Sequence, residues 1–201
     1  MLPLEERIAA VADVLRRGGL ALYPTETFYA LGALWSHPAA LQRLAAAKGR
    51  PGGKPLPLVA ASRAQAEEVA FLSHPVALRL AACFWPGPLT LVLPARPAVP
   101  AAITAGTGTA GVRIPGSDIA RALALAAGGA LVSTSANPSG GQPPLRAADV
   151  DPALSAGVEA VLDTGPAPGG LPSTVVEVGQ EGPRLLRAGA VAWNAVLDAA
   201  R

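Results

Sequence analysis

The chain has 201 residues with a formal net charge of +2, 51% hydrophobic residues and 15% charged residues. This hydrophobic content is high enough to bury a core and excludes a disordered chain, although the chain contains 22 Gly and 21 Pro. A single Cys and two His exclude an intrachain disulfide and a His/Cys metal cluster, so no residue is predicted as a metal ligand.

The N-terminal segment 1–7 carries three charges and lacks the apolar stretch of a signal peptide. The longest uncharged apolar run, residues 122–132, is too short to span a bilayer. We therefore expect a cytoplasmic protein without membrane contact.

Periodicity and Gly/Pro punctuation predict helices and strands along the whole chain. In chain order they are helix 4–17, strand 20–24, helix 38–49, strand 55–61, helices 63–70 and 75–84, strands 89–94 and 111–115, helix 117–127, strands 130–135, 158–163, 173–178 and 183–187, and a closing helix from about 189. The elements interleave without strict alternation, and the late strands lie close enough to pair antiparallel. This order predicts an α/β fold with a mixed parallel and antiparallel sheet, as a single domain over residues 1–201.

The basic residues are unevenly distributed. Between Thr27 and Ser117 the net charge is +6, whereas the rest of the chain carries −4. Fourteen of the 16 basic residues are Arg, and the two lysines, Lys48 and Lys54, lie with Arg50 in the stretch KGRPGGK. Glycines let a backbone approach a ligand closely and cations neutralise phosphate, so this loop is a candidate anion site.

Two other polar segments follow predicted strands: PTET, beginning at Pro24, and STSANPSG, beginning at Ser133. PTET also fits a helix-capping box, and Asn-Pro with Ser-Gly also fits a plain turn. The GTGTAG stretch from Gly106 resembles a dinucleotide fingerprint, but it precedes a strand and opens no helix. We therefore exclude that interpretation.

Seven motifs occur in the order found in the threonylcarbamoyl-AMP synthases, the YrdC-like family. They are PTETxYxLG, KGRPxxKPL, FWPGPLTLVL, VRIP, TSANPSG, DTG…STVV and LRAGAV. The resemblance runs from about Gly19 to Val191. One departure is Ala30, where the family usually has Gly, and it removes no functional group. The sequence ends at Arg201, so the resemblance predicts the short form without a C-terminal domain.

The resemblance implies a twisted mixed sheet with surrounding helices and a large basic cavity. It implies an L-threonylcarbamoyladenylate synthase, a nucleotidyltransferase that condenses L-threonine, bicarbonate and ATP and releases pyrophosphate. The product serves tRNA threonylcarbamoyladenosine formation, so downstream tRNA threonylcarbamoyl transferase proteins are expected partners. Mg²⁺ is expected with ATP, held by phosphates and water, with Glu26 as the one nearby acid.

Site residues follow from the resemblance motif by motif. It implies that Lys48 and Arg50 are catalytic and form the nucleotide site with Ser135 and Asn137, while Lys54, Thr109 and Arg187 complete the ATP contacts. It implies that threonine is held by Thr25, Arg113, Ser133 and Ser173, with Arg113 binding the carboxylate through a fork of hydrogen bonds.

Two alternatives remain. A noncatalytic module that binds tRNA or double-stranded RNA would also use a basic surface, but no RNA motif is found and aromatic residues make up only 4%. An enzyme that uses another carbamoyl donor, like the related domain of hydrogenase maturation proteins, belongs to much longer chains with zinc-binding and acylphosphatase parts.

Overall fold

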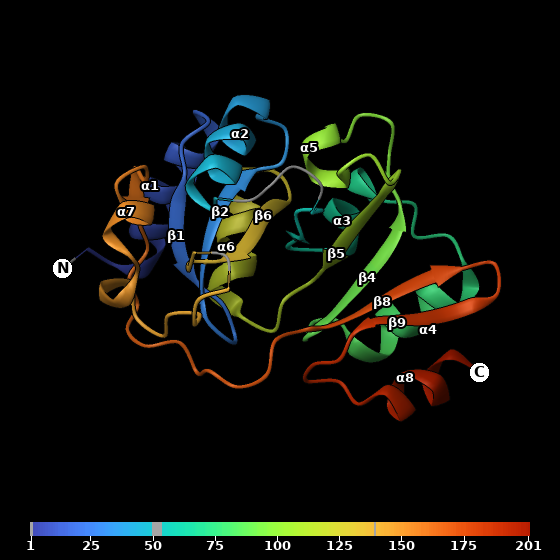
Figure 1. Ribbon diagram of the computed structural model, residues 1–201. Coiled ribbons are helices and arrows are strands. Elements are labelled where there is room, and N and C mark those ends of the chain that lie inside the picture. The colour runs from blue at the N-terminus through green and yellow to red at the C-terminus, as the bar shows by residue number, and fades with distance from the viewer. Residues whose placement is uncertain (1, 50–53, 139) are drawn as a thin grey trace.

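One nine-stranded sheet organises the chain in the computed structural model, which describes residues 2–49, 54–138 and 140–201 (Figure 1). The strands are β1 (Ala21–Pro24), β2 (Tyr29–Leu34), β3 (Leu58–Val59), β4 (Leu89–Pro94), β5 (Thr109–Arg113), β6 (Leu131–Ser135), β7 (Ala160–Val161), β8 (Thr174–Gly179) and β9 (Gly182–Arg187). They are ordered β7-β1-β2-β6-β3-β5-β4-β8-β9.

The sheet is mixed. Pairs β1–β7, β3–β5 and β4–β8 are parallel, whereas β1–β2, β2–β6, β3–β6, β4–β5 and β8–β9 are antiparallel. The predicted α/β class with a mixed sheet is therefore confirmed. Antiparallel pairing of late strands is confirmed for β8 and β9, whereas β7 pairs in parallel with β1.

Helices pack against this sheet. They are α1 (Leu4–Arg16), α2 (Pro38–Ala47), α3 (Arg63–Val69), α4 (Pro75–Phe84), α5 (Ala101–Thr104), α6 (Asp118–Ala127), α7 (Pro152–Ser155) and α8 (Trp193–Ala200), with a 3-10 turn at Ala147–Asp149. The short elements α5, α7 and the 3-10 turn are not predicted by the sequence, because one turn of helix shows no periodicity. No helix in the described ranges is long and apolar enough to cross a membrane.

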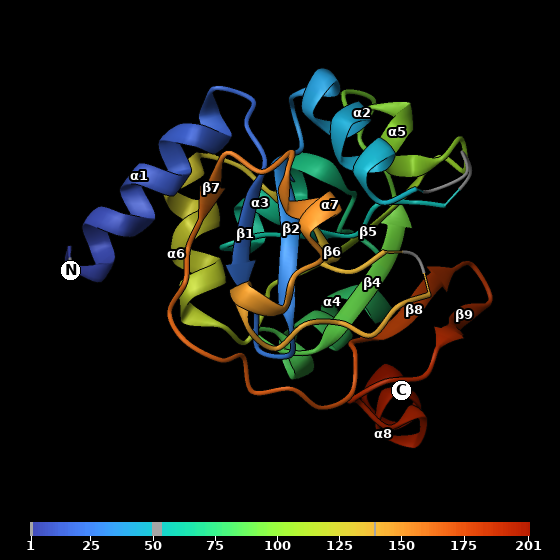
Figure 2. The same cartoon turned by 60° about the vertical axis from the view of Figure 1, so that its left-hand side comes forward.

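The side chains of β1 point alternately to the two faces of the sheet, and both faces are covered. Ala21 and Tyr23 pack with α1 and α6, while Leu20 and Leu22 face the larger core that includes α2. Strand side chains point alternately to opposite faces, so one short strand serves both cores. Helices α1 and α6 lie side by side on one face, and β8, β9 and α8 lie at the other end of the molecule (Figures 1 and 2).

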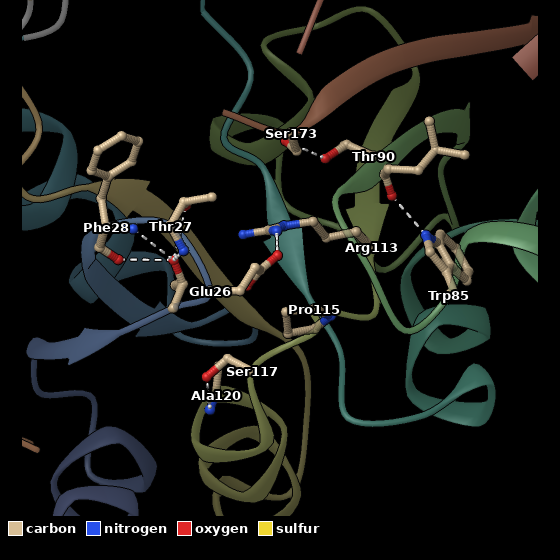
Figure 3. Close-up of polar contacts among 12 residues, drawn as sticks. Glu26, Thr27, Phe28, Trp85, Thr90, Arg113, Pro115, Ser117, Ala120 and Ser173 are labelled. Carbon is tan, nitrogen blue, oxygen red and sulfur yellow. Dashed lines mark hydrogen bonds and ion pairs between the residues drawn. The ribbon is translucent and has the colours of Figure 1, made fainter. Parts of the chain in front are cut away.

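Strand β2 is not predicted from the sequence. All six residues of β2 are buried, so the strand lacks the polar alternation that marks a half-exposed strand. Because β2 follows Phe28 directly, PTET is a hairpin turn and the capping-box alternative is wrong. Strand β4 has the predicted bounds. Helix α6 begins one residue after its predicted start, and Ser117 caps it, because the Ser117 hydroxyl accepts from the Ala120 N–H (3.2 Å; Figure 3).

Candidate functional site

A cavity of about 990 Å³ covers one face of the sheet from β2 to β9. Its lining includes eight of the residues predicted for threonine or ATP: Thr25, Lys54, Thr109, Arg113, Ser133, Ser135, Ser173 and Arg187. These residues come from loops and strands that are distant in sequence, and the sheet brings them together. Residues from motifs that are separate in the sequence thus line one cavity.

Strand β5 forms part of this cavity wall. Thr109, Gly111 and Arg113 line the cavity, whereas Ala110 and Val112 between them are fully buried in the core. The four residue steps from Thr109 to Arg113 span about 13 Å of strand, so the two residues stand at opposite ends of β5. Gly111 leaves room between them, since an added Cβ would already touch the Thr90 Cγ2 at 3.4 Å. The cavity therefore has a Thr109 end and an Arg113 end.

The Thr109 end carries hydroxyls and one lysine. The hydroxyls of Thr107 and Thr109 lie 2.9 Å apart and form a hydrogen bond. Lys54 and Ser135 line the same cavity, and Lys54 is exposed. Because Leu58 pairs with both Val112 and Val132, the residues before β3 and the end of β6 lie toward Thr109. Within the described ranges Lys54 has no carboxylate partner, so its charge is available to an anion.

At the Arg113 end, the guanidinium pairs with Glu26 through Nη1 and Oε1 (Figure 3). The two side chains are only 11% and 18% exposed. Glu26 does not line the cavity, and its second oxygen, Oε2, is buried with no hydrogen-bond partner among the described residues. Glu26 therefore holds Arg113 from outside the cavity wall and leaves the other guanidinium nitrogens for a ligand.

A chain of hydrogen bonds joins Arg187 to Ser173 and Thr90. Arg187 Nη2 donates to the Ser173 hydroxyl (2.9 Å) and to the Ser173 carbonyl oxygen (2.7 Å). The Ser173 and Thr90 hydroxyls lie 3.0 Å apart (Figure 3). Register supports this arrangement, because Val175 on β8 pairs with both Thr90 and Arg187. Arg187, predicted for ATP, thus contacts Ser173, predicted for threonine.

Two arginines give this end its positive potential. Partial burial lowers the pKa of Arg187, and the charge of Arg113 lowers it further. A guanidinium nevertheless stays protonated in proteins, so both groups remain cationic. Cations that repel each other across a cavity attract an anion placed between them.

Thr25 lines the cavity and also builds the β1–β2 turn. Its hydroxyl donates to the Phe28 carbonyl oxygen (2.8 Å) and accepts from the N–H groups of Thr27 and Phe28, each at 3.2 Å. A hydroxyl with these local bonds fixes the backbone on either side of Glu26. Its predicted contact with threonine remains a prediction.

Lys48 follows the C-terminal end of α2 and is 3% exposed. Its ammonium donates to the carbonyl oxygens of Ser135 (2.6 Å) and Asn137. The Asn137 amide donates to the carbonyl oxygens of Pro138 (2.9 Å) and Gly141 (2.6 Å). Lys48, Ser135 and Asn137 thus lie together, and Lys48 hydrogen-bonds the backbone carbonyl oxygens of the other two residues. Arg50 lies outside the described residues.

Three features of the site are not predicted from the sequence: Thr90, Thr107 and the Glu26–Arg113 pair. A signal for Thr90 was present, because it is the single polar residue of the strand LTLVLP. Thr107 lies in GTGTAG, whose glycine spacing indicates only a dinucleotide fingerprint. The ion pair joins residues 87 positions apart, and no local pattern indicates it.

The described residues contain no group of three or more His, Cys, Asp or Glu side chains that could hold a metal ion. The acids at or beside the cavity, Glu26 and Glu177, are paired with Arg113 and Arg184. This donor set does not fit an ion held by protein ligands.

The fold and the site define an α/β protein with an open mixed sheet and a cavity on one face whose lining includes three arginines. The family model Sua5_yciO_yrdC, described as telomere recombination, matches residues 13–189. The chain belongs to this family, which confirms the resemblance found in the sequence.

Relatives and solved structures agree. The chain is 40% identical over 185 residues to a threonylcarbamoyl-AMP synthase of Pyrococcus abyssi, covering 92% of this chain and 54% of the relative. It is 44% identical over 145 residues to one of Halorhodospira halophila, covering 72% and 75%. The structure of P. abyssi Sua5 complexed with L-threonine matches with a TM-score of 0.91 and 38% identity, over 97% of this chain and 57% of that one. Escherichia coli YciO matches with a TM-score of 0.85 and 26% identity, over 97% and 95%. The chain thus spans about half the length of the P. abyssi synthase.

Proposed function

We propose that the chain is an L-threonylcarbamoyladenylate synthase, which converts L-threonine, bicarbonate and ATP into threonylcarbamoyl-AMP and pyrophosphate. One observation carries the proposal: a single cavity of about 990 Å³ holds an arginine at one end and a lysine among hydroxyls at the other. The carboxylate of threonine and the polyphosphate of ATP need separate cationic binding positions of this kind. The P. abyssi relative named threonylcarbamoyl-AMP synthase, 40% identical, supports the same activity.

Threonine belongs at the Arg113 end. Arg113 keeps donors beyond the nitrogen that bonds Glu26, and these can take the carboxylate of the amino acid as a fork. Ser133 and Ser173 supply hydroxyls that can donate or accept, and Thr25 lines the same cavity. The likeness to P. abyssi Sua5 complexed with L-threonine supports this placement.

ATP belongs along the Thr109 side. Lys54, Thr109 and Ser135 face the cavity there, and Arg187 offers a second cation across the sheet. Lys48, Asn137 and Arg50 complete the proposed nucleotide site. Lys48 acts in part by holding the Ser135–Asn137 backbone in place.

The proposed reaction needs no covalent intermediate with the protein. The threonine amine forms an N–C bond to bicarbonate, which loses water to give a carbamate. A carbamate oxygen then attacks the α-phosphorus of ATP, and the bond from that phosphorus to the bridging oxygen breaks, so pyrophosphate leaves with its charge. Catalysis then consists of positioning and charge neutralisation, which the cations and hydroxyls of this cavity can supply.

We also propose how the enzyme is organised, where it works and what it binds. Residues 1–201 act as one domain, which the single sheet running from β7 to β9 supports. Mg²⁺ enters as part of the ATP substrate, bound by phosphates and water. The protein works in the cytoplasm and passes its product to tRNA threonylcarbamoyl transferase proteins, and its basic surface allows direct contact with tRNA.

Pyrophosphate release tests the activity. The purified chain is incubated with ATP, Mg²⁺ and bicarbonate, together with each amino acid in turn. We expect release that depends on both bicarbonate and L-threonine. Lys48→Ala and Arg50→Ala should abolish it with the fold intact by circular dichroism. Arg63→Ala, which changes an exposed arginine paired with Glu67 away from the cavity, is the matched control.

Release that ignores threonine would overturn the proposal. Near-normal rates in both Lys48→Ala and Arg50→Ala would show that the site is misassigned. If the chain releases no pyrophosphate but binds tRNA in a salt-dependent way, the noncatalytic RNA-binding alternative is the better description.

A further inference from the structure

The cavity of the proposed synthase must keep two anions apart. One is the carboxylate of a zwitterionic amino acid, and the other is a polyphosphate with several negative charges. Arg113 is an attractive partner for both, because guanidinium groups bind carboxylate and phosphate with the same fork geometry. An unpaired Arg113 would therefore favour the more highly charged ligand.

Glu26 changes the charge that Arg113 presents. The pair is largely removed from water, so the negative charge of Glu26 is only weakly screened at Arg113. Its Oε2 atom is buried without a partner among the described residues, so no donor besides Arg113 offsets that charge there. The Arg113–Glu26 unit has no net charge but carries a strong dipole, with its positive end at the cavity and its negative end outside the wall.

A dipole of this kind stabilises a bound zwitterion but provides little net attraction for a polyanion. The carboxylate of an amino acid can bond Arg113 while its ammonium group is attracted by Glu26 through space. Each charge of a polyphosphate is instead attracted by Arg113 and repelled by Glu26. Lys54 and Arg187 line the same cavity and have no carboxylate partner among the described residues. Their positive charges are therefore not offset by a neighbouring acid, and both attract a polyphosphate.

We propose that Glu26 is a specificity residue that reserves Arg113 for the carboxylate of an amino-acid substrate and directs phosphate groups to Lys54 and Arg187. This inference rests on the proposed function for the identity of its ligands. Glu26 acts through Arg113 and is a positioning residue, since its carboxylate lies outside the cavity lining.

The test uses calorimetric titration of the full chain with inorganic pyrophosphate and with L-threonine. For the wild-type protein we expect the two ligands to bind together without competing. For Glu26→Gln we expect pyrophosphate to bind at least tenfold more tightly and to compete with threonine, whose own affinity falls. Glu26→Asp, which keeps the charge, should retain the wild-type separation.

Glu177→Gln is the matched control, because it adds the same charge at another acid of the cavity, the partner of Arg184. It tests whether any added positive charge has the same effect. We expect it to leave pyrophosphate and threonine noncompetitive, even if pyrophosphate binds more tightly. If Glu177→Gln also creates competition, the effect belongs to net charge and the proposal fails.

The double variant Glu26→Gln/Arg113→Gln keeps the net charge of the pair and covers the case in which Glu26→Gln does not fold. It should lose threonine binding and bind pyrophosphate within threefold of wild type. Loss of pyrophosphate binding would show that Arg113 already holds phosphate, which overturns the proposal. An unchanged pyrophosphate affinity in Glu26→Gln would also overturn it. A wild-type chain that binds no threonine would instead count against the proposed function, and the pyrophosphate titrations would still decide the role of Glu26.

Discussion

The ammonium group of Lys48 donates a hydrogen bond of 2.6 Å to the carbonyl oxygen of Ser135, 87 positions later in the chain. The same ammonium also bonds the Asn137 carbonyl oxygen. It thereby ties the end of α2 to the end of β6. The sequence presents KGRPGGK and STSANPSG as separate motifs, and these contacts join Lys48 of the first to Ser135 and Asn137 of the second.

We predict that Lys48→Met lowers both activity and stability. The buried carbonyl oxygens would lose a charged donor, which costs about 1–3 kcal/mol of unfolding free energy, and pyrophosphate release should fall below detection. Lys54→Met is the matched control: Lys54 is exposed, so stability should stay unchanged while the KM for ATP rises. Urea unfolding and steady-state kinetics give the two readouts. A fully stable Lys48→Met would show that the backbone contacts contribute nothing.

Strand β2 offers a second prediction at Gly32 and Ala30, which lie on the same side of the strand. At Gly32 an added Cβ would lie 2.5 Å from the Tyr23 Cε1 and 2.8 Å from the Val132 carbonyl oxygen. Gly32→Ala should therefore destabilise the protein by about 2–3 kcal/mol. Ala30→Gly, which restores the residue usual in the family, should cost only about 1 kcal/mol through backbone entropy and leave kinetics unchanged. Thermal unfolding of both variants measures this, and equal effects would contradict the steric argument.

Some of the structure could be predicted because its cause is local. The LTLVLP pattern defines β4 to the residue, since alternating apolar side chains enter the core while Thr90 and Val92 face the cavity. Ser117 marks the start of α6 because a hydroxyl there can accept from a helix N–H. Cap and alternation signals lie within a few residues of the element that they define.

Other features depend on contacts between distant segments. Strand β2 reads as a uniform apolar run, because it pairs with β1 and β6 and is covered on both faces. The Glu26 contact with Arg113 and the Lys48 contact with Ser135 each span 87 positions. Residue types and spacing could place Lys48 in a candidate anion loop, but only the folded chain shows that its ammonium bonds backbone carbonyls.

We predict a specific loss of stability at alkaline pH from Tyr29. Burial and the hydrogen bond to Asp163 raise the pKa of Tyr29 to about 12. The unfolded chain loses this proton near pH 10, so the contribution of Tyr29 is complete below pH 10 and is lost between pH 10 and 12. Wild-type stability should fall more steeply over that range than stability of Tyr29→Phe. Urea unfolding at several pH values measures the slopes.

Tyr29→Phe should also be less stable at pH 8, by about 1–2 kcal/mol, because the hydroxyl donates to Asp163 and to the Gly165 carbonyl oxygen. The gap between the two proteins should therefore narrow as pH rises. Tyr23, the other tyrosine, is present in both proteins and cancels in the comparison. Parallel slopes would show that Tyr29 titrates alike in the folded and unfolded chains.

The hydrogen-bond chain at the Arg113 end predicts coupling between Thr90 and Ser173. The Ser173 hydroxyl accepts from Arg187, so its own proton is available for Thr90. Thr90→Val and Ser173→Ala each leave one hydroxyl without that partner, and each should cost about 1 kcal/mol. The double variant should lose about as much as one single variant, since it removes both ends of one bond. Urea unfolding of the four proteins tests this, and strictly additive losses would contradict it.

The same variants separate the two ends of the cavity by kinetics. Ser173→Ala should raise the KM for threonine several-fold and the KM for ATP less, because Ser173 lies at the Arg113 end and meets the triphosphate only through Arg187. Thr109→Val, at the other end of β5, should do the reverse. Both changes remove one hydroxyl from one cavity wall, so each serves as the control for the other. If Ser173→Ala raises the KM for ATP more than the KM for threonine, the Ser173 hydroxyl serves the triphosphate beside Arg187, and its assignment to threonine is wrong.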